Sequence, residues 1–328
     1  GLSIADFVSI QEVYIHKMVN ENGMERIQGI IAEGSEEKLF QKAEKGFVSL
    51  FIKDEKGNRK NIFSGIVDSL EVENAGGVKS ARIVLTGATK LMDCILHTRT
   101  FQNEALPYEK LLGTVNAGNG KVAYLSNCGL KSTIKKLIVQ YRETDWEFIK
   151  RLAAMNHTVI FADCSTRGEK YHFGIPDRKP DSEEIPGEYR VNYDMQEYWY
   201  KKSRGLTIHT EDTISYILES REFHKLGERR VIDGKETFIW KIECSLRGNE
   251  LYHTCYMKPY AGFQSTLYRN KYISGVSLLG MVTKVRNEKV QIKIYSDENK
   301  DKSGFCWYSF STVYSSPDGT GWYCMPEI

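Results

Sequence analysis

The sequence lacks any apolar run long enough to cross a membrane. Its longest apolar runs, such as residues 47–52, fall far short of the roughly 20 residues that a spanning helix needs. No stretch near the N-terminus combines a basic region, an apolar core and a small-residue cleavage site. We therefore expect neither a transmembrane segment nor a signal peptide.

Paired cysteines are also missing. The chain has seven cysteines, an odd number, and no CxxC pair, whereas zinc modules need closely spaced ligand pairs. No GxxxxGK[ST] phosphate loop, HExxH zinc motif or GxSxG elbow occurs. The sequence predicts buried thiols in a reducing compartment, with no disulfide framework, no metal site and no cofactor.

Charge of one sign is not in excess. The 45 Lys and Arg residues face 43 Asp and Glu residues, which leaves a net charge of +2. Nucleic-acid-binding proteins usually carry a concentrated basic footprint, and here the basic residues are spread along the chain. We expect no nucleic-acid partner.

The first hundred residues have the pattern of β-structure. Apolar residues alternate or run together at 47–52, 66–73 and 81–86, and turn residues such as Gly76 and Gly77 separate these runs. Lys56-Gly57-Asn58 has the composition of a tight hairpin. Short strands at this spacing favour an antiparallel barrel or sandwich.

Helical patterns occupy the middle of the chain. Pro107 stands where a helix can begin, and a second short helix is predicted over 132–139. A third begins at Thr144, which with Glu147 has capping-box spacing ahead of an apolar stripe containing Leu152. Residues 101–178 are therefore predicted to be an α/β insertion in a β protein.

From residue 187 the pattern is β again. Asp233-Gly234 lies between two strand-like runs and predicts a hairpin, and residues 247–250 predict another. The polar segment 178–186, with two prolines, has the composition of a linker. The fold class predicted from these patterns is mainly β (α+β).

Two motifs resemble one known family. The first is a Q-Y-R-E-S/T-D-x-x-F-x-x-R-L-like segment, here Gln140, Tyr141, Arg142, Glu143, Thr144, Asp145, Phe148, Arg151 and Leu152. The second is a glycine-opened strand followed by a tryptophan-rich end, marked by Gly280, Trp307 and Trp322. In this order they resemble the VgrG-like hub and spike proteins of contractile injection systems, including the late control D-like phage tail proteins.

The same signature residues also have a modest interpretation of their own. Thr144 caps a helix, Phe148 and Leu152 pack, and either Arg142 or Glu143 pairs across an interface.

The resemblance implies a structural protein and no enzyme. It implies two hub β-barrels at 1–100 and 179–274, the α/β insertion at 101–178 and an OB-like spike-base module at 275–328. Only three or four of the five OB strands can be counted, so we expect either a truncated module or a short-spiked variant. The implied assembly is a homotrimer that joins a hexameric inner-tube protein to a spike tip protein and baseplate components. Such a hub is cytoplasmic during assembly, later part of an injected or released particle, and meets a membrane only transiently during piercing.

Two other functions are compatible with parts of the sequence, a wall-degrading hydrolase and a carbohydrate-binding or adhesin module. A wall-degrading hydrolase needs two carboxylates around the scissile bond, for which Glu211 and Asp212 are candidates, or a nucleophile such as Cys164 or Cys255 with His253. Glu211 and Asp212 have the surroundings of an ordinary polar loop, and neither a third orienting group nor a nucleophile motif accompanies the cysteines and His253. The segment 297–304 has some calcium-loop character but lacks the required glycine and glutamate, so a solvated hairpin is the better interpretation.

A carbohydrate-binding or adhesin module is the third class. Four clustered aromatic residues favour it: Tyr193, Tyr198, Trp199 and Tyr200. Aromatic residues are equally typical of protein interfaces, which a trimeric hub would have.

Overall fold

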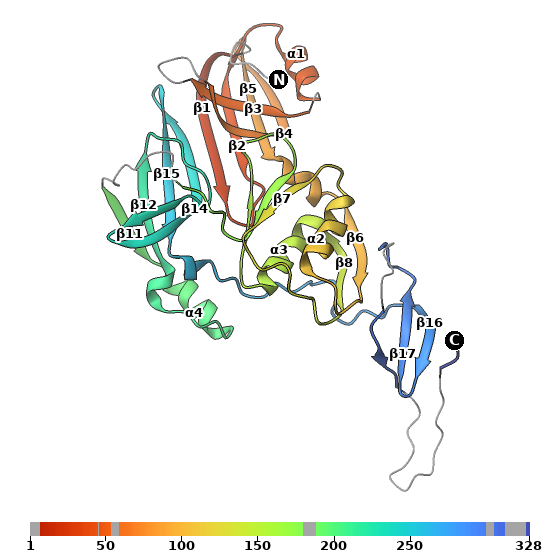
Figure 1. Ribbon diagram of the computed structural model, residues 1–328. Helices are drawn as coiled ribbons and strands as arrows, with labels where there is room; N and C mark the ends of the chain where they lie inside the picture. Colours follow the sequence, from red (N-terminus) through yellow and green to blue (C-terminus); the bar gives the residue numbers. More distant parts are fainter. Residues whose placement is uncertain (1–6, 45, 54–58, 180–187, 300–304, 312–325) are drawn as a thin grey trace. The chain divides into compact units, whose positions relative to one another are not determined.

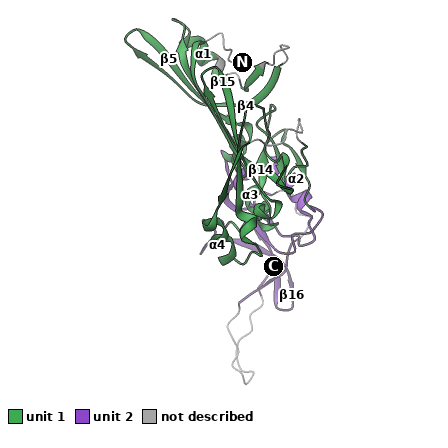
Figure 2. Cartoon of the chain, turned by 90° about the vertical axis from the view of Figure 1, so that its left-hand side faces the viewer, with its two compact units in different colours: residues 1–93, 119–128, 149–268 green, residues 94–118, 129–148, 269–328 purple. Residues whose placement is uncertain are grey.

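The computed structural model describes residues 7–44, 46–53, 59–179, 188–299, 305–311 and 326–328 (Figure 1). Strands account for 46% of it and helices for 18%, which confirms the prediction of a mainly β fold. The chain forms two compact units that interleave along the sequence (Figure 2). Unit 1 comprises 1–93, 119–128 and 149–268, and unit 2 comprises 94–118, 129–148 and 269–328. The four-part division inferred from the resemblance stays a prediction.

A ten-stranded sheet forms the body of unit 1. Its strand order is β11-β12-β15-β14-β1-β2-β5-β4-β3, with β13 paired to β14 outside this path. The strands are β1 (Phe7–Met18), β2 (Met24–Ile31), β3 (Val48–Lys53), β4 (Arg59–Ala75), β5 (Val78–Gly87), β11 (Tyr189–Tyr193), β12 (Ile214–Ser220), β13 (Arg229–Ile232), β14 (Lys235–Arg247) and β15 (Glu250–Lys258).

Smaller elements complete unit 1. A second sheet has the order β7-β10-β9, with β10 parallel to β7 and antiparallel to β9. These elements are β7 (Ala123–Ser126), β9 (Ile160–Ala162), β10 (Lys170–Phe173), α1 (Glu36–Ala43), α4 (Met195–Ser203) and the 3₁₀ turns η2 (Ala88–Asp93), η3 (Thr210–Thr213) and η4 (Tyr260–Phe263). Helix α3 (Asp145–Met155) spans the boundary, with its first turn in unit 2.

The two expected hub barrels are not closed in the described part of the chain. The strands of both halves, β1–β5 and β11–β15, instead belong to one sheet, in which β1 pairs with β14 from Tyr14↔Ser245 to Met18↔Lys241. A strand has only two hydrogen-bonding edges. Because β2 and β14 occupy both edges of β1, β3 cannot pair with β1 to close a barrel.

The predicted hairpins are confirmed where they are described. Asp233 and Gly234 join β13 to β14 with φ of 50° and 73°, as a type I′ turn requires. The predicted turn at 247–250 joins β14 to β15, which pair up to Arg247↔Glu250. The turn at Lys56-Gly57-Asn58 and most of the predicted linker at 178–186 lie outside the described residues.

Unit 2 contains a ribbon of β6 (Leu96–Phe101) and β8 (Ile138–Thr144), helix α2 (Tyr108–Ala117) and a C-terminal sheet. Helix α2 begins directly after Pro107, as predicted. The helix predicted over 132–139 is wrong, because Lys135 has a φ of 59° and residues from Ile138 onward pair with β6. An apolar spacing over eight residues does not separate a helix from a loop that leads into a strand.

The C-terminal sheet of unit 2 has three strands in the described residues, where an OB barrel has five. They are β16 (Gly280–Arg286), β17 (Lys289–Ile294) and the short β18 (Tyr308–Ser309), in the order β16-β17-β18. The predicted opening of the module at Gly280 coincides with the start of β16.

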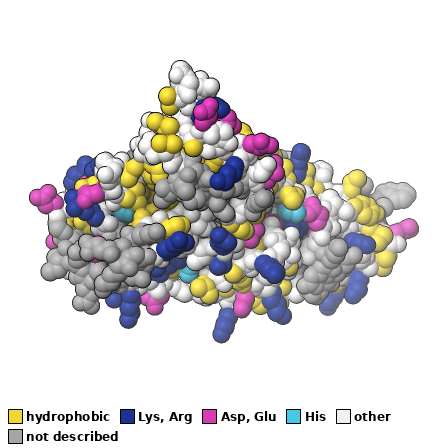
Figure 3. All heavy atoms as spheres, turned by 90° about the horizontal axis from the view of Figure 1, so that it is seen from above, with side chains coloured by type: hydrophobic (Ala, Val, Ile, Leu, Met, Phe, Trp, Pro, Cys, Tyr) yellow, Lys and Arg dark blue, Asp and Glu magenta, His cyan; other side chains and the backbone are white. Residues whose placement is uncertain are grey.

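Charged side chains of both signs are mixed on the surface. On the face shown in Figure 3, Lys and Arg side chains are scattered among Asp and Glu rather than gathered into one basic patch. Among the described residues, no helix is both long and apolar enough to cross a bilayer.

The sheet of unit 1 buries a carboxyl group without a partner. Glu25 on β2 is fully buried, and neither of its carboxyl oxygens has a hydrogen-bond partner within the described chain. Burial raises the pKa of Glu25 to about 8, and the ammonium group of Lys17 only partly offsets this effect. Lys17 itself is buried, donating to the Ile62 carbonyl at 2.5 Å and lying over the Phe63 ring.

Glu25→Gln is expected to flatten the pH dependence of stability. Because the pKa of Glu25 is higher in the folded than in the unfolded chain, the folded state binds more protons between pH 4.5 and 8. Stability therefore falls by up to about 1.4 kcal/mol per pH unit across this window and levels off above it. In denaturant unfolding, the variant should gain most over the wild type near pH 8 and least near pH 4.5. The exposed residue Glu71 provides the control Glu71→Gln. If the free energy of unfolding has the same slope against pH in Glu25→Gln, the wild type and this control, Glu25 does not cause the pH dependence.

Candidate functional site

The signature residues lie on β8 and at the start of α3, in unit 2. Antiparallel pairing sets Arg99 of β6 opposite Gln140 of β8 and His97 opposite Glu143. Between these pairs the register shifts, so that Arg142 is an extra residue with a φ of 46°. This β-bulge reverses which side chains point to each face of the strand, which lets neighbouring signature residues take different directions.

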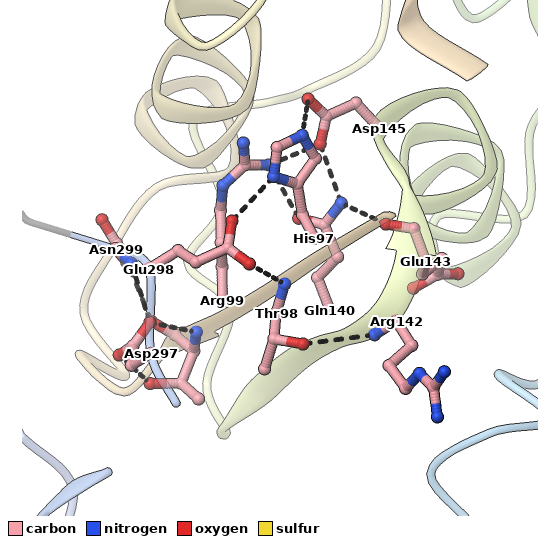
Figure 4. A network of polar contacts seen from close by, with 11 residues as sticks. His97, Thr98, Arg99, Gln140, Arg142, Glu143, Asp145, Asp297, Glu298 and Asn299 are labelled. Atoms are coloured by element: carbon pink, nitrogen blue, oxygen red, sulfur yellow. Dashed lines mark hydrogen bonds and ion pairs between the residues drawn. The ribbon is translucent and has the colours of Figure 1, made fainter. Parts of the chain in front are cut away.

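A buried polar network joins the ribbon to the helix (Figure 4). The Arg99 guanidinium forms an ion pair with Asp145 and donates to Gln140 Oε1 at 3.0 Å. Gln140 Nε2 donates to Asp145 Oδ1 at 2.8 Å and to the Glu143 carbonyl at 3.0 Å. A buried ion pair is stable only when further hydrogen bonds satisfy both ions, and Gln140 supplies them here.

Asp145 also opens helix α3. It lies in the first turn, where a carboxylate is favoured by the helix dipole. The preceding Thr144 accepts a hydrogen bond from Glu147 N at 3.2 Å through Oγ1, which confirms its predicted capping role. Phe148, one turn later, is fully buried and stacks on Phe101 of β6 at 5.8 Å between ring centroids. Both polar and apolar contacts therefore fix α3 to the ribbon.

The network extends to the loop after β17 (Figure 4). His97 Nδ1 lies 2.7 Å from Glu298 Oε2, and its Nε2 lies 3.7 Å from Asp145 Oδ2. The other Glu298 oxygen accepts from Thr98 N at 2.8 Å, while Glu298 N donates to the Thr98 carbonyl at 2.9 Å. One glutamate thus holds the free edge of β6 by backbone and side chain together.

Asp297 and Asn299 continue this attachment. Asp297 accepts from Thr100 N at 2.9 Å and from its hydroxyl, and Asn299 Nδ2 donates to the Thr100 carbonyl at 3.2 Å. The interpretation of this segment as a solvated hairpin is therefore wrong for 297–299, and 300–304 lie outside the described residues. These three residues replace a missing neighbour strand on β6.

Two further residues, Gln102 and Asn270, tie the C-terminal part of unit 2 to the ribbon. Gln102, just after β6, donates to the Ile292 carbonyl at 3.2 Å and accepts from the Tyr308 hydroxyl at 3.2 Å. Asn270 Nδ2 donates to the Tyr141 carbonyl at 2.8 Å and lies 3.3 Å from Glu143 Oε2. The ribbon is therefore bonded on one side to α3 and on the other to segments more than 100 residues later.

Arg142 differs from the rest of the signature. Its backbone N–H bonds Thr98 Oγ1 at 3.4 Å, but its side chain is exposed and points away from the network (Figure 4). Within the described residues its guanidinium has no hydrogen-bond or ion-pair partner. Glu143, the other candidate for an interface pair, is buried and bonded to Asn270. The bulge thus turns the Arg142 side chain outward, while the neighbouring Glu143 side chain points inward.

The remaining residues of the first signature motif are buried or half-buried. Tyr141 and Arg151 are half-buried, and Leu152 is fully buried in α3. Trp307 is half-buried just before β18, and Trp322 lies outside the described residues. Sequence analysis missed His97, Arg99 and Glu298, which carry no motif. The only available signal was that His97 and Arg99, two apart in a strand, share a face.

The candidates for catalysis do not form a reactive site. Burial raises the pKa of the Cys164 thiol to about 12 and also raises that of Cys255, so both remain protonated. Burial lowers the pKa of His253 to about 3, and this ring lies 3.0 Å from the Cys244 sulfur. Asp212 accepts from His209 N in a 3₁₀ cap, while Glu211 is exposed. The described residues include no group of three metal-ligating side chains.

Comparison with known proteins agrees with this geometry. Residues 47–193 match the family of the phage tail baseplate hub (GPD). The first signature motif, at residues 140–152, lies within this matched range. That family is structural, and the resemblance inferred from the sequence is confirmed. No curated protein matches the chain.

Several solved structures share the fold. The E. coli c3393 protein, a type VI secretion component with structural similarity to T4 tail proteins gp27 and gp5, is 11% identical with a TM-score of 0.57, over 87% of this chain and 85% of that one. A 43 kDa tail protein of prophage MuSo2 from Shewanella oneidensis is 10% identical with a TM-score of 0.57, over 80% of this chain and 96% of that one. A chain of the Francisella PdpA–VgrG complex is 11% identical with a TM-score of 0.59, over 96% of this chain and 70% of that one.

Asp145→Ala is expected to destabilise the protein by about 3–5 kcal/mol, because it leaves the Arg99 guanidinium buried without its ion-pair partner. Urea unfolding followed by circular dichroism measures this loss. Replacing both ions, as Arg99→Met with Asp145→Leu, should cost less than Asp145→Ala alone. An unchanged unfolding midpoint for Asp145→Ala would show that the network carries no stability.

The anchoring loop allows a second test. Replacing Asp297 and Glu298 by Ala removes the acceptors of the Thr98 and Thr100 amides, so hydrogen exchange at both amides should accelerate at least tenfold. Mass-spectrometric exchange of peptides covering β6 measures this effect. The matched control is Glu288→Ala, an exposed residue in the β16–β17 turn. Exchange equal to that of the control would show that the loop does not hold β6.

Proposed function

We propose that this chain, similar over residues 47–193 to the phage tail baseplate hub family, forms the homotrimeric hub of a contractile injection machine. In this role it joins a hexameric inner tube to the spike tip and the remaining baseplate. The observation that carries the proposal is the position of the family signature on the β6–β8 ribbon. This ribbon is bonded to helix α3 through Gln140 and Asp145, and to the C-terminal segment through Thr98 and Glu298. A part that transmits thrust toward a tip needs such a stiff connection.

The arrangement of the large sheet supports the symmetry of the proposal. Each chain carries two strand sets, β1–β5 and β11–β15, side by side in one sheet. Three chains would place six strand sets around a ring, which matches the symmetry of a hexameric tube. A closed trimer uses head-to-tail contacts, so each chain needs two different and complementary surfaces.

The signature supports an intermolecular role for Arg142. Non-glycine residues adopt a positive φ at a cost of about 1–2 kcal/mol, so the bulge at this position is retained against local strain. The bulge directs a guanidinium outward, and arginine is among the residues that contribute most to protein interfaces. In the proposed assembly Arg142 binds a carboxylate or carbonyl of a neighbouring subunit.

The test is the oligomeric mass by light scattering after size exclusion, over a range of protein concentrations. The wild-type chain should have about three times its 37.6 kDa mass. Arg142→Ala removes the proposed contact and should raise the concentration needed for the trimer at least tenfold, with the unfolding midpoint almost unchanged. Arg286→Ala, another exposed arginine of unit 2, is the matched control.

The outcomes separate the two parts of the proposal. A monomer at every wild-type concentration would contradict the trimer. A stable trimer that Arg142→Ala and Arg286→Ala leave equally intact would keep the hub and reject the role of Arg142.

A further inference from the structure

A groove of about 510 Å³ opens in unit 1. It is lined by the end of β1 and the residues that follow it, Lys150 of α3, Val159, one face of α4, Trp240 of β14, Lys258 of β15, and η4 with the segment after it. Its volume lies within the range of about 300–1,000 Å³ that is typical of ligand pockets. Nothing in the hub assignment uses it.

Two buried lysines share one carboxylate in this groove. Lys201 Nζ and Lys258 Nζ lie 2.6 Å and 3.2 Å from the same oxygen of Glu197, and both lysines are at least 90% buried. Asp194, another carboxylate of the groove, accepts a hydrogen bond from Glu197 N as the cap of α4. The lining also holds Lys150 and Glu21, so acidic and basic side chains are equal in number around the groove. Because both buried ammonium groups share one oxygen of Glu197, N–H donors exceed acceptors at this point of the groove.

Lys258 has unused donor capacity. Its ammonium group lies 4.9 Å from the centre of the Trp240 ring and 5.2 Å from that of Phe263, so aromatic faces occupy much of its surroundings. Burial lowers its pKa to about 8, which still leaves it mostly charged at neutral pH. Lys201 is better satisfied, because it also donates to the Gly262 carbonyl at 2.5 Å.

A neutral donor in the same groove lacks an acceptor. The indole Nε1 of Trp240 is buried and has no hydrogen-bond partner in the described part of the chain. Leaving a buried N–H unsatisfied costs roughly 1–3 kcal/mol. Any occupant that offers oxygen acceptors would recover this cost.

We propose that the groove binds a carboxylate, held by Lys258 and the Trp240 indole N–H, and that the carboxylate belongs to an acidic peptide segment of another protein. A carboxylate accepts several hydrogen bonds at once, and its bonds to an ammonium group are charge-assisted and therefore stronger than those of a neutral acceptor. The rim favours a peptide over a small free acid. Tyr200 lines the groove and is 49% exposed, and Trp199 beside it on α4 is 59% exposed, as is typical of residues that anchor a protein partner.

The test uses the full chain with its tryptophans labelled for NMR at the indole nitrogen. The probe is an acetylated and amidated hexapeptide with one central glutamate among alanines, compared with its glutamine twin. The glutamate peptide should shift the Trp240 indole signal and bind at least tenfold more tightly than the twin. Trp240→Phe keeps an aromatic ring in the groove but loses the N–H. It therefore assigns the signal and should weaken binding about fivefold or more.

Two further variants test whether the preference for glutamate depends on Lys258. Trp199→Phe, on the exposed rim, should retain the preference for glutamate, and Lys258→Met should abolish it. If Lys258→Met fails to fold, the weakened binding expected of Trp240→Phe still tests whether the groove holds the carboxylate. Equal binding of both peptides, or no shift with either, would overturn the proposal. Glutarate binding as tightly as the glutamate peptide would overturn the peptide as source and assign the groove to a free carboxylate. None of these outcomes depends on trimer formation.

Discussion

The pairing of β1 with β14 is the constraint on which the large sheet depends. It joins strands that are more than 200 residues apart in sequence, and it occupies the second edge of β1. The N-terminal strands therefore continue into the C-terminal set instead of closing on themselves. A single sheet therefore contains both strand sets, and in the proposed trimer three such sheets supply the six sets that meet a hexameric tube.

In unit 2 the family signature acts at the join between segments. Gln140 and Asp145 point inward and satisfy the buried Arg99, while the bulge at Arg142 turns one side chain outward. On the far edge of β6, Asp297 and Glu298 take the place of a neighbour strand. One short motif thus places polar residues inside the chain and one arginine on its surface.

Local patterns were predicted well where the chemistry is local. The turn at Asp233-Gly234, the cap at Thr144 and the helix start after Pro107 depend on residues within a few positions of each other. The helix expected over 132–139 was wrong because β6, about 40 residues earlier, pairs with Ile138 and its successors. The solvated hairpin expected at 297–299 was wrong for the same kind of reason, since its partner strand lies 200 residues earlier.

The sequence alone determined the mainly β class, the hairpins, the family resemblance and the residues of the signature, because each depends on short-range periodicity or on a contiguous motif. Only the tertiary structure decided that the two strand sets form one open sheet, and that His97, Arg99 and Glu298 meet the signature. It also decided that Lys258 and Trp240 share a groove. These are pairings between distant segments, and an isolated charge or strand edge carries no local mark of the partner that will satisfy it.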